Sequence, residues 1–211
     1  MNITDALGLV IAIGLGSAYA IVEANASASN SADSTATAPI VHFDRDDKEF
    51  FLYSPQDYKQ EFCLAQNIFF EASVDNKAGM IAVADVTLNR VQDVRYPNTV
   101  CGVVKDAKLK ESWKTKQYPD LNPEERIYIP IRNKCQFSWY CDGKADDIPM
   151  GSENWVKSQT VAWEMMHGGA HRGLTEGSTH YHATYVSPYW QNSKNMNLVG
   201  RIGAHIFYRW D

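Results

Sequence analysis

The chain has 211 residues, which suits one domain with an appendage or two small lobes. Hydrophobic residues make up 45% of it and aromatic residues 12%, so it can build a sizeable core. The formal net charge is -5 and no basic stretch interrupts it. A nucleic-acid partner would require clustered Lys and Arg, so the sequence argues against this class of function and we expect no nucleic-acid partner.

The first 24 residues have the composition of a targeting segment. Ala6 to Val22 is uncharged and apolar, too short for a comfortable membrane span but long enough for a signal-peptide core. Ala18-Tyr-Ala20 and Ala24-Asn-Ala26 fit the small-x-small cleavage pattern, although Asp5 and the lack of Lys or Arg before the core are atypical. We expect residues 1–24 to be a signal peptide or a signal-arrest membrane segment; the alternative is a buried core helix.

Residues 25–45 are rich in Ala, Ser and Thr and predict a flexible linker, which leaves 46–211 for the folded domain. Export would place this domain in the periplasm or cell envelope, with transient membrane association through the leader.

Pro55 to Ala72 predicts the first helix of the domain, and it carries one carboxylate in an apolar run. At helical spacing Glu71 shares a face with Leu64, Asn67 and Ile68. Apolar neighbours disfavour the charged form of a carboxyl group, so it keeps its proton nearer neutral pH. A protonated carboxyl can donate to a leaving-group oxygen, whereas the alternative is a Glu at the solvent edge of the helix.

Lys77 to Val91 predicts a second, nearly all-apolar helix at the centre of the core. Asp85 lies inside it, and we expect this carboxylate to bond to Asn89 on the helix face; a second active-site carboxylate is the alternative. Val100 to Val104 predicts a short helix, and residues 105–134 look polar and irregular.

The last part of the chain mixes one helix with strands. Ser152 looks like the N-cap of a helix that runs through His167. Thr179 to Val186 and Ile202 to Trp210 alternate as strands do. Helices followed by a small late sheet predict an α+β domain.

Four cysteines, Cys63, Cys101, Cys135 and Cys141, fit an oxidising compartment. Spacing does not fix their pairing, because four cysteines allow three connectivities. A local bridge between Cys135 and Cys141 would close a short loop, and Cys63 and Cys101 would then tie the first helix to the loop after the second. Zinc bound by four thiolates is the rival interpretation, which the lack of a C-x-x-C pair disfavours.

The segment from Cys63 to Ala72 resembles the opening motif of the SleB-like cell wall hydrolases, which include spore-cortex lytic enzymes and related bacterial and phage proteins. The later segments that match, in the family's order, are Val83–Arg90, Arg95–Val104, Cys135–Trp139 with Cys141–Gly143, Thr179–His182, Val186–Trp190 and Ile202–Tyr208. The resemblance covers residues 60 to 209, and the polar stretch around 105–130 falls outside it.

The resemblance implies a mainly helical, lysozyme-like domain with a small C-terminal antiparallel sheet. It implies cleavage of the peptidoglycan glycan strand between N-acetylmuramic acid and N-acetylglucosamine by one catalytic glutamate, which matches Glu71. Lytic transglycosylase chemistry is implied, with a muramidase-type hydrolase as the alternative and a phage endolysin as one biological setting. The cysteine-bearing branch of the family matches all four cysteines, which supports the pairing above. Ser73 replaces an Arg common in the family motif, and Asp85 stands where members vary.

A single acid that then serves as base needs no second carboxylate and no cofactor. Gln136, Ser138, His180 and Tyr181 would supply hydrogen bonds to N-acetyl and hydroxyl groups of the glycan. Trp139 would stack on a sugar face, with core packing as the alternative for the Trp and Tyr side chains. We expect the enzyme to act as a monomer.

Two competing classes remain. His180 and His182 lie on one strand face and His205 could join them from the next strand, which would suit zinc and a peptidoglycan amidase or peptidase. The chain has no HExxH motif to support such a site. A catalytically silent wall-binding or virion structural protein is the third class, and activity on purified peptidoglycan separates it from both enzymes.

Overall fold

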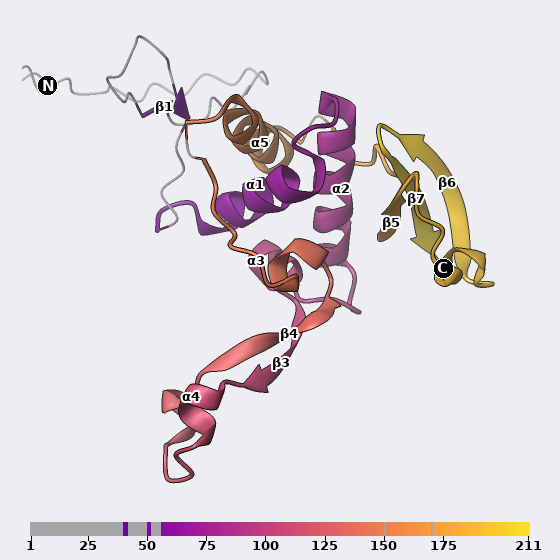
Figure 1. Ribbon diagram of the computed structural model, residues 1–211. Helices are drawn as coiled ribbons and strands as arrows, with labels where there is room; N and C mark the ends of the chain where they lie inside the picture. Colours follow the sequence, from indigo (N-terminus) through magenta and orange to yellow (C-terminus); the bar gives the residue numbers. More distant parts are fainter. Residues whose placement is uncertain (1–39, 42–49, 52–55, 150, 170) are drawn as a thin grey trace, which may run out of the picture. The chain divides into compact units, whose positions relative to one another are not determined.

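The computed structural model describes residues 40–41, 50–51, 56–149, 151–169 and 171–211 (Figure 1). The expected targeting segment over residues 1–24 lies outside the described residues, as does most of the expected linker. Within the described ranges, no helix is long and apolar enough to cross a membrane. Two short strands, β1 (Ile40–Val41) and β2 (Phe50–Phe51), pair antiparallel ahead of the helices.

Helices α1 (Lys59–Ala72) and α2 (Lys77–Gln92) form the centre of the core with α3 (Val100–Val104) and α5 (Glu153–Trp163). The second helix and the short third helix lie where the sequence predicts them. The structure begins α1 at Lys59 rather than at Pro55.

Helices α2 and α5 are each preceded by an N-cap residue whose side chain accepts a hydrogen bond from a backbone N–H of the first turn. The Asn76 side chain accepts from Gly79 N at 2.9 Å, and Ser152 Oγ accepts from Trp155 N at 3.2 Å. Ser152 is therefore the N-cap that the sequence predicts. Beyond α5 the chain continues as a π-helical turn, η3 (Glu164–Gly168), which accounts for the rest of the expected helix. Gly169 ends it in the left-handed conformation, with φ 62°.

The stretch expected to be irregular contains a β-hairpin, so that expectation is wrong. Strand β3 (Ala107–Glu111) pairs antiparallel with β4 (Tyr128–Cys135), and the connection carries α4 (Trp113–Lys116) and the 3-10 turn η1 (Pro123–Glu125). Figure 1 shows the two strands side by side with α4 at their closed end. Both strands expose residues on both faces, so their sequence lacks the apolar alternation by which strands are recognised.

A three-stranded antiparallel sheet of order β5-β7-β6 follows the helices. Its strands are β5 (His180–Ala183), β6 (Met196–Ile202) and β7 (His205–Trp210), and a 3-10 turn, η4 (Tyr189–Asn192), lies between β5 and β6. The expected strand from Ile202 to Trp210 is two strands, because Gly203 turns the chain with φ 57°. The domain is therefore α+β, mainly helical with a small C-terminal antiparallel sheet, as predicted.

Both favoured disulfides are present. Cys63 is joined to Cys101, which ties α1 to α3, and Cys135 is joined to Cys141. The second bridge ties the end of β4 to the 3-10 turn η2 (Ser138–Cys141). All four cysteines are thus in disulfides, and zinc held by four thiolates is excluded.

Asp85 is a structural residue, but not in the way that the sequence suggests. Its side chain is fully buried and forms an ion pair with Arg172. It also accepts from Gly173 N at 3.2 Å, from Thr175 N at 2.9 Å and from Thr175 Oγ1 at 2.7 Å. Asn89 bonds to the same Arg172 at 3.0 Å rather than to Asp85. The carboxylate therefore fastens α2 to the loop at 172–175, and its oxygens are committed there.

Candidate active site

Glu71 lies in the last turn of α1 and lines a cavity of about 520 Å³. Other lining residues come from β5 and the residues after it, including Tyr181 and Tyr185, and from the segment around η2, including Gln136 and Ser138. Three segments far apart in the sequence thus meet around one carboxyl group. The volume falls in the range of small-ligand sites.

Burial is the main influence on the Glu71 carboxyl group, and it raises the pKa of Glu71 above its ordinary value. Two smaller effects act in the opposite direction: a hydrogen bond from Tyr181 and the positive charge of Arg90. The net result is a raised pKa, so the proton is held to higher pH than on an exposed Glu. This is the behaviour that the apolar face of α1 predicts.

Tyr181 fixes the orientation of the carboxyl group. Its hydroxyl donates to Glu71 Oε2 at 3.0 Å. Burial, with a further contribution from Glu71, raises the pKa of Tyr181 well above its usual range, so the phenol keeps its proton and remains the donor. No described residue hydrogen-bonds to Oε1, which leaves this oxygen available to a substrate.

The Trp139 indole lines the cavity and also packs closely against its neighbours, so its expected stacking on a sugar stays a prediction beside the alternative of core packing. The residue is only 8% exposed, and its ring stacks on Phe70 with centroids 4.5 Å apart. Its Nε1 donates to Asn67 Oδ1 at 3.0 Å, and Asn67 Nδ2 donates to Thr87 Oγ1 at 3.1 Å. This buried chain of bonds holds η2 against α1 one turn before Glu71.

The other expected substrate-binding residues divide into two groups. Gln136 and Ser138 are exposed and line the cavity, as does Tyr181. His180 is not part of the cavity lining. Its ring lies 5.5 Å from the rings of both Trp190 and Trp210, and burial lowers its pKa to about 4.

Three charged residues that line the cavity, Arg90, Asp142 and Lys144, were missed from the sequence. Arg90 on α2 is 5% exposed, with its guanidinium 5.0 Å from the Phe137 ring and 5.3 Å from the Tyr96 ring. Asp142, after η2, accepts from Lys144 N at 2.8 Å and pairs with Lys144 Nζ at 3.4 Å. These bonds lower the pKa of Asp142, so a second, ionised carboxylate borders the same cavity as Glu71. The family-like segments Val83–Arg90 and Cys141–Gly143 contain Arg90 and Asp142 and could have pointed to both.

Comparison with known proteins decides the family. A family profile described as Cell Wall Hydrolase matches residues 74–208, well over half of the chain. The chain belongs to this family. It is thus a cell wall hydrolase, a peptidoglycan-degrading enzyme. The matched residues begin after Glu71.

Two solved structures are similar to this chain, and a search of curated proteins found no match. One is the catalytic domain of the germination-specific lytic transglycosylase SleB from Bacillus anthracis, 22% identical, with a TM-score of 0.46 over 74% of this chain and 97% of that one. The other is the catalytic domain of the Bacillus cereus SleB protein, 22% identical, with a TM-score of 0.44 over 72% of this chain and 91% of that one.

The zinc hypothesis fails on geometry. His205 pairs with Ala183 across β5 and β7, so it faces the opposite side of the sheet from His180 and His182. His182 Nε2 lies 3.1 Å from the Tyr208 hydroxyl. Among the described residues, no three His, Cys, Asp or Glu side chains are grouped so that they could hold a metal ion.

Proposed function

We propose that this cell wall hydrolase cleaves the bond between N-acetylmuramic acid and N-acetylglucosamine as a lytic transglycosylase, with Glu71 as the only acid and base. The observation that carries the proposal is one half-buried carboxyl group with a raised pKa, held by Tyr181 at the wall of a cavity. Its chemistry fits both halves of such a reaction.

In the first half, protonated Glu71 donates its proton to the glycosidic oxygen while the bond from that oxygen to C1 of muramic acid breaks. In the second half, the resulting carboxylate takes the proton of the muramic acid 6-hydroxyl, whose oxygen bonds to C1. The product is a 1,6-anhydro sugar, and Glu71 regains its proton. Water takes no part, and Tyr181 keeps the carboxyl group oriented throughout by donating to Oε2.

A muramidase-type hydrolase is the second candidate, because Asp142 borders the same cavity as an ionised carboxylate. Glycosidases that use water employ one protonated and one ionised carboxyl group on the two sides of the scissile bond. In that mechanism Asp142 would activate the water or stabilise the sugar cation. Its pairing with Lys144 and its place near solvent favour a structural role at the cavity rim instead.

Mass spectrometry of the soluble products from purified sacculi, together with Asp142→Asn, separates the two mechanisms. The transglycosylase predicts anhydromuropeptides, and Asp142→Asn should keep activity within about threefold of the wild type. Reducing-end saccharides, with a loss of about 100-fold or more in Asp142→Asn, would replace our proposal with the hydrolase.

We also propose that the enzyme is exported to the periplasm or cell envelope, with the leader as a transient membrane attachment, and that it acts as a monomer. Export is supported by the apolar composition of residues 6–22 and by the two disulfides.

A further inference from the structure

A second hollow adjoins the candidate active site at the base of the β3–β4 hairpin. Its volume is about 350 Å³, and its lining residues are Asp106, Ala107, Lys108, Lys134, Cys135 and Gln136. Gln136 also lines the cavity that holds Glu71. The two hollows therefore share this residue and lie next to each other.

The hairpin base is fixed to the wall of the active-site cavity. Gln136 N donates to Asp106 O at 2.9 Å, and Ala107 is paired with Cys135 across the two strands. The disulfide from Cys135 to Cys141 then joins β4 to the far end of η2. The position of the second hollow relative to Gln136 and Ser138 is thus set by covalent and backbone bonds.

The charge of this hollow is opposite to that of the whole chain. Lys108 and Lys134 are both exposed, and within the described part of the chain neither forms an ion pair. Asp106 contributes the acidic side chain of the lining, so the two ammonium groups leave a positive balance in a protein of net charge -5.

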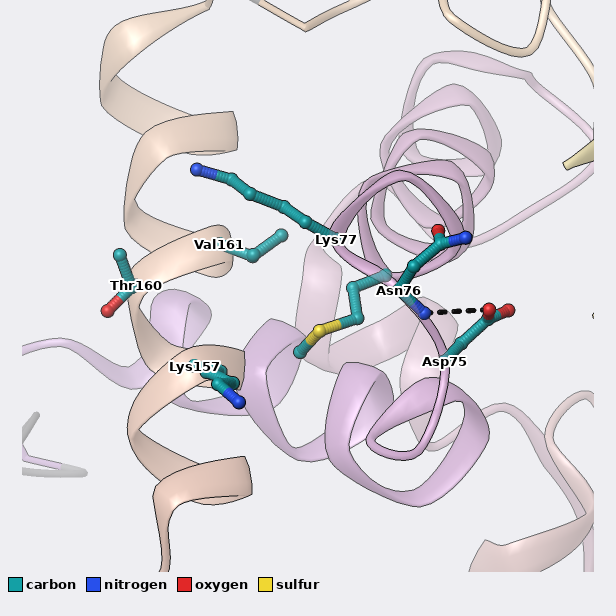
Figure 2. A pocket seen from close by; sticks show the side chains of 7 residues that line it. Asp75, Asn76, Lys77, Lys157, Thr160 and Val161 are labelled. Carbon is teal, nitrogen blue, oxygen red and sulfur yellow. Dashed lines mark hydrogen bonds between the residues drawn. The ribbon is translucent and has the colours of Figure 1, made fainter. Parts of the chain in front are cut away.

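A different cavity of similar size provides the contrast. It lies between the start of α2 and α5, measures about 320 Å³ and is also lined by two lysines, Lys77 and Lys157 (Figure 2). There each ammonium group is engaged by a carboxylate, Lys77 with Glu164 at 2.8 Å and Lys157 with Glu153 at 2.6 Å. Lys108 and Lys134 at the hairpin base, by contrast, form no ion pair with any described residue.

We propose that the hollow at the hairpin base binds the stem peptide of peptidoglycan, with Lys108 and Lys134 pairing with the carboxylates of that peptide. The inference rests on the proposed function. The muramic acid whose glycosidic bond breaks beside Glu71 carries a peptide rich in carboxylates on its lactyl group. That peptide must leave the cavity over a neighbouring surface, and the hollow that shares Gln136 with the cavity presents the complementary charge.

The test is co-sedimentation with purified sacculi, on ice, in a Glu71→Gln background so that the polymer stays intact. Lys108→Ala/Lys134→Ala should weaken binding by about three- to tenfold, since two exposed ion pairs are lost. The matched control, Lys77→Ala/Lys157→Ala, removes two lysines from the other cavity and should bind as the parent does. The Lys108→Ala/Lys134→Ala protein is called the hairpin variant, and its parent is Glu71→Gln. Raising the salt concentration should reduce the difference in sacculus binding between the two.

Two further arms identify the ligand. On glycan strands freed of stem peptides by an amidase, the hairpin variant and the parent should bind equally well. On vesicles of phosphatidylcholine and phosphatidylglycerol, neither lysine pair should matter. Equal binding to intact sacculi, a difference that persists on peptide-free glycan, or lysine-dependent binding to the vesicles alone would each overturn the proposal.

The lytic assay keeps this test apart from the proposed function. Full lytic activity in Glu71→Gln would refute the catalytic role of Glu71. A binding difference between the lysine pairs would still stand in that case, because the parent and both double-lysine variants share the same background and any remaining cleavage acts equally on all three.

Discussion

Glu71 and Tyr181 influence each other's protonation through one hydrogen bond. Burial raises the pKa of both groups, and Tyr181 remains the donor because its phenol keeps its proton. The bond favours the carboxylate form of Glu71, so it partly offsets the effect of burial on the carboxyl pKa. Such a compromise suits a group that must release a proton and then accept one back.

Tyr181→Phe should therefore change both the rate and its pH dependence. Removing the hydroxyl removes a donor to the charged form, so the pKa of Glu71 should rise further. Activity that needs protonated Glu71 is lost as pH rises through this pKa, so the descending limb of the profile should move to higher pH. We expect kcat to fall by about 10- to 100-fold, because a hydrogen bond to a charged group is lost. Lysis rates measured across pH test this; a limb at the wild-type position or lower would contradict it.

Individual site residues could be predicted from the sequence where they lie within a short, recognisable motif. The apolar face of α1 predicts the raised pKa of Glu71, and the C-terminal motif contains Tyr181. The partners of Asp85 could not be found this way, because Arg172 and Thr175 lie far along the chain and come together with α2 only in the fold. The same holds for the bond between Trp139 and Asn67, which joins residues far apart in the sequence.

At the scale of elements, the helices were predictable because apolar periodicity and caps such as Ser152 identify them locally. The β3–β4 hairpin was not, because its two strands are covered on neither face and carry no alternating pattern. The split of the last predicted strand depends on the single turn at Gly203. Apolar periodicity thus predicts an element well where the element packs on the core, and poorly where both of its faces are exposed.

The disulfides should contribute unequally to the stability of the elements that they join. The Cys63–Cys101 bridge spans 38 residues and the Cys135–Cys141 bridge spans 6. In the chain-entropy model these loops correspond to about 4 and about 2 kcal/mol. Cys63→Ala/Cys101→Ala should thus lower the Tm more than Cys135→Ala/Cys141→Ala, as thermal melts would show. The opposite ranking would mean that native-state strain or the hairpin base dominates.

At the scale of the whole molecule, holding Glu71 in its cavity costs folding free energy at neutral pH. Its folded-state pKa is raised, so its contribution to stability is fully present below the unfolded pKa and is lost as pH rises through the folded pKa. A neutral amide does not titrate and can still accept the bond from Tyr181. The Glu71→Gln protein should therefore be at least as stable as the wild type at neutral pH, which separates loss of chemistry from loss of fold.

The central claim is that Glu71 is the acid that breaks the glycan strand, and the lysis of purified sacculi by Glu71→Gln tests it most directly. Turbidity loss should fall by about 100- to 10,000-fold, because the amide keeps the shape of the side chain and loses the transferable proton. A thermal melt of the same preparation should show a Tm no lower than that of the wild type. A folded variant that clears sacculi at close to the wild-type rate would contradict the account.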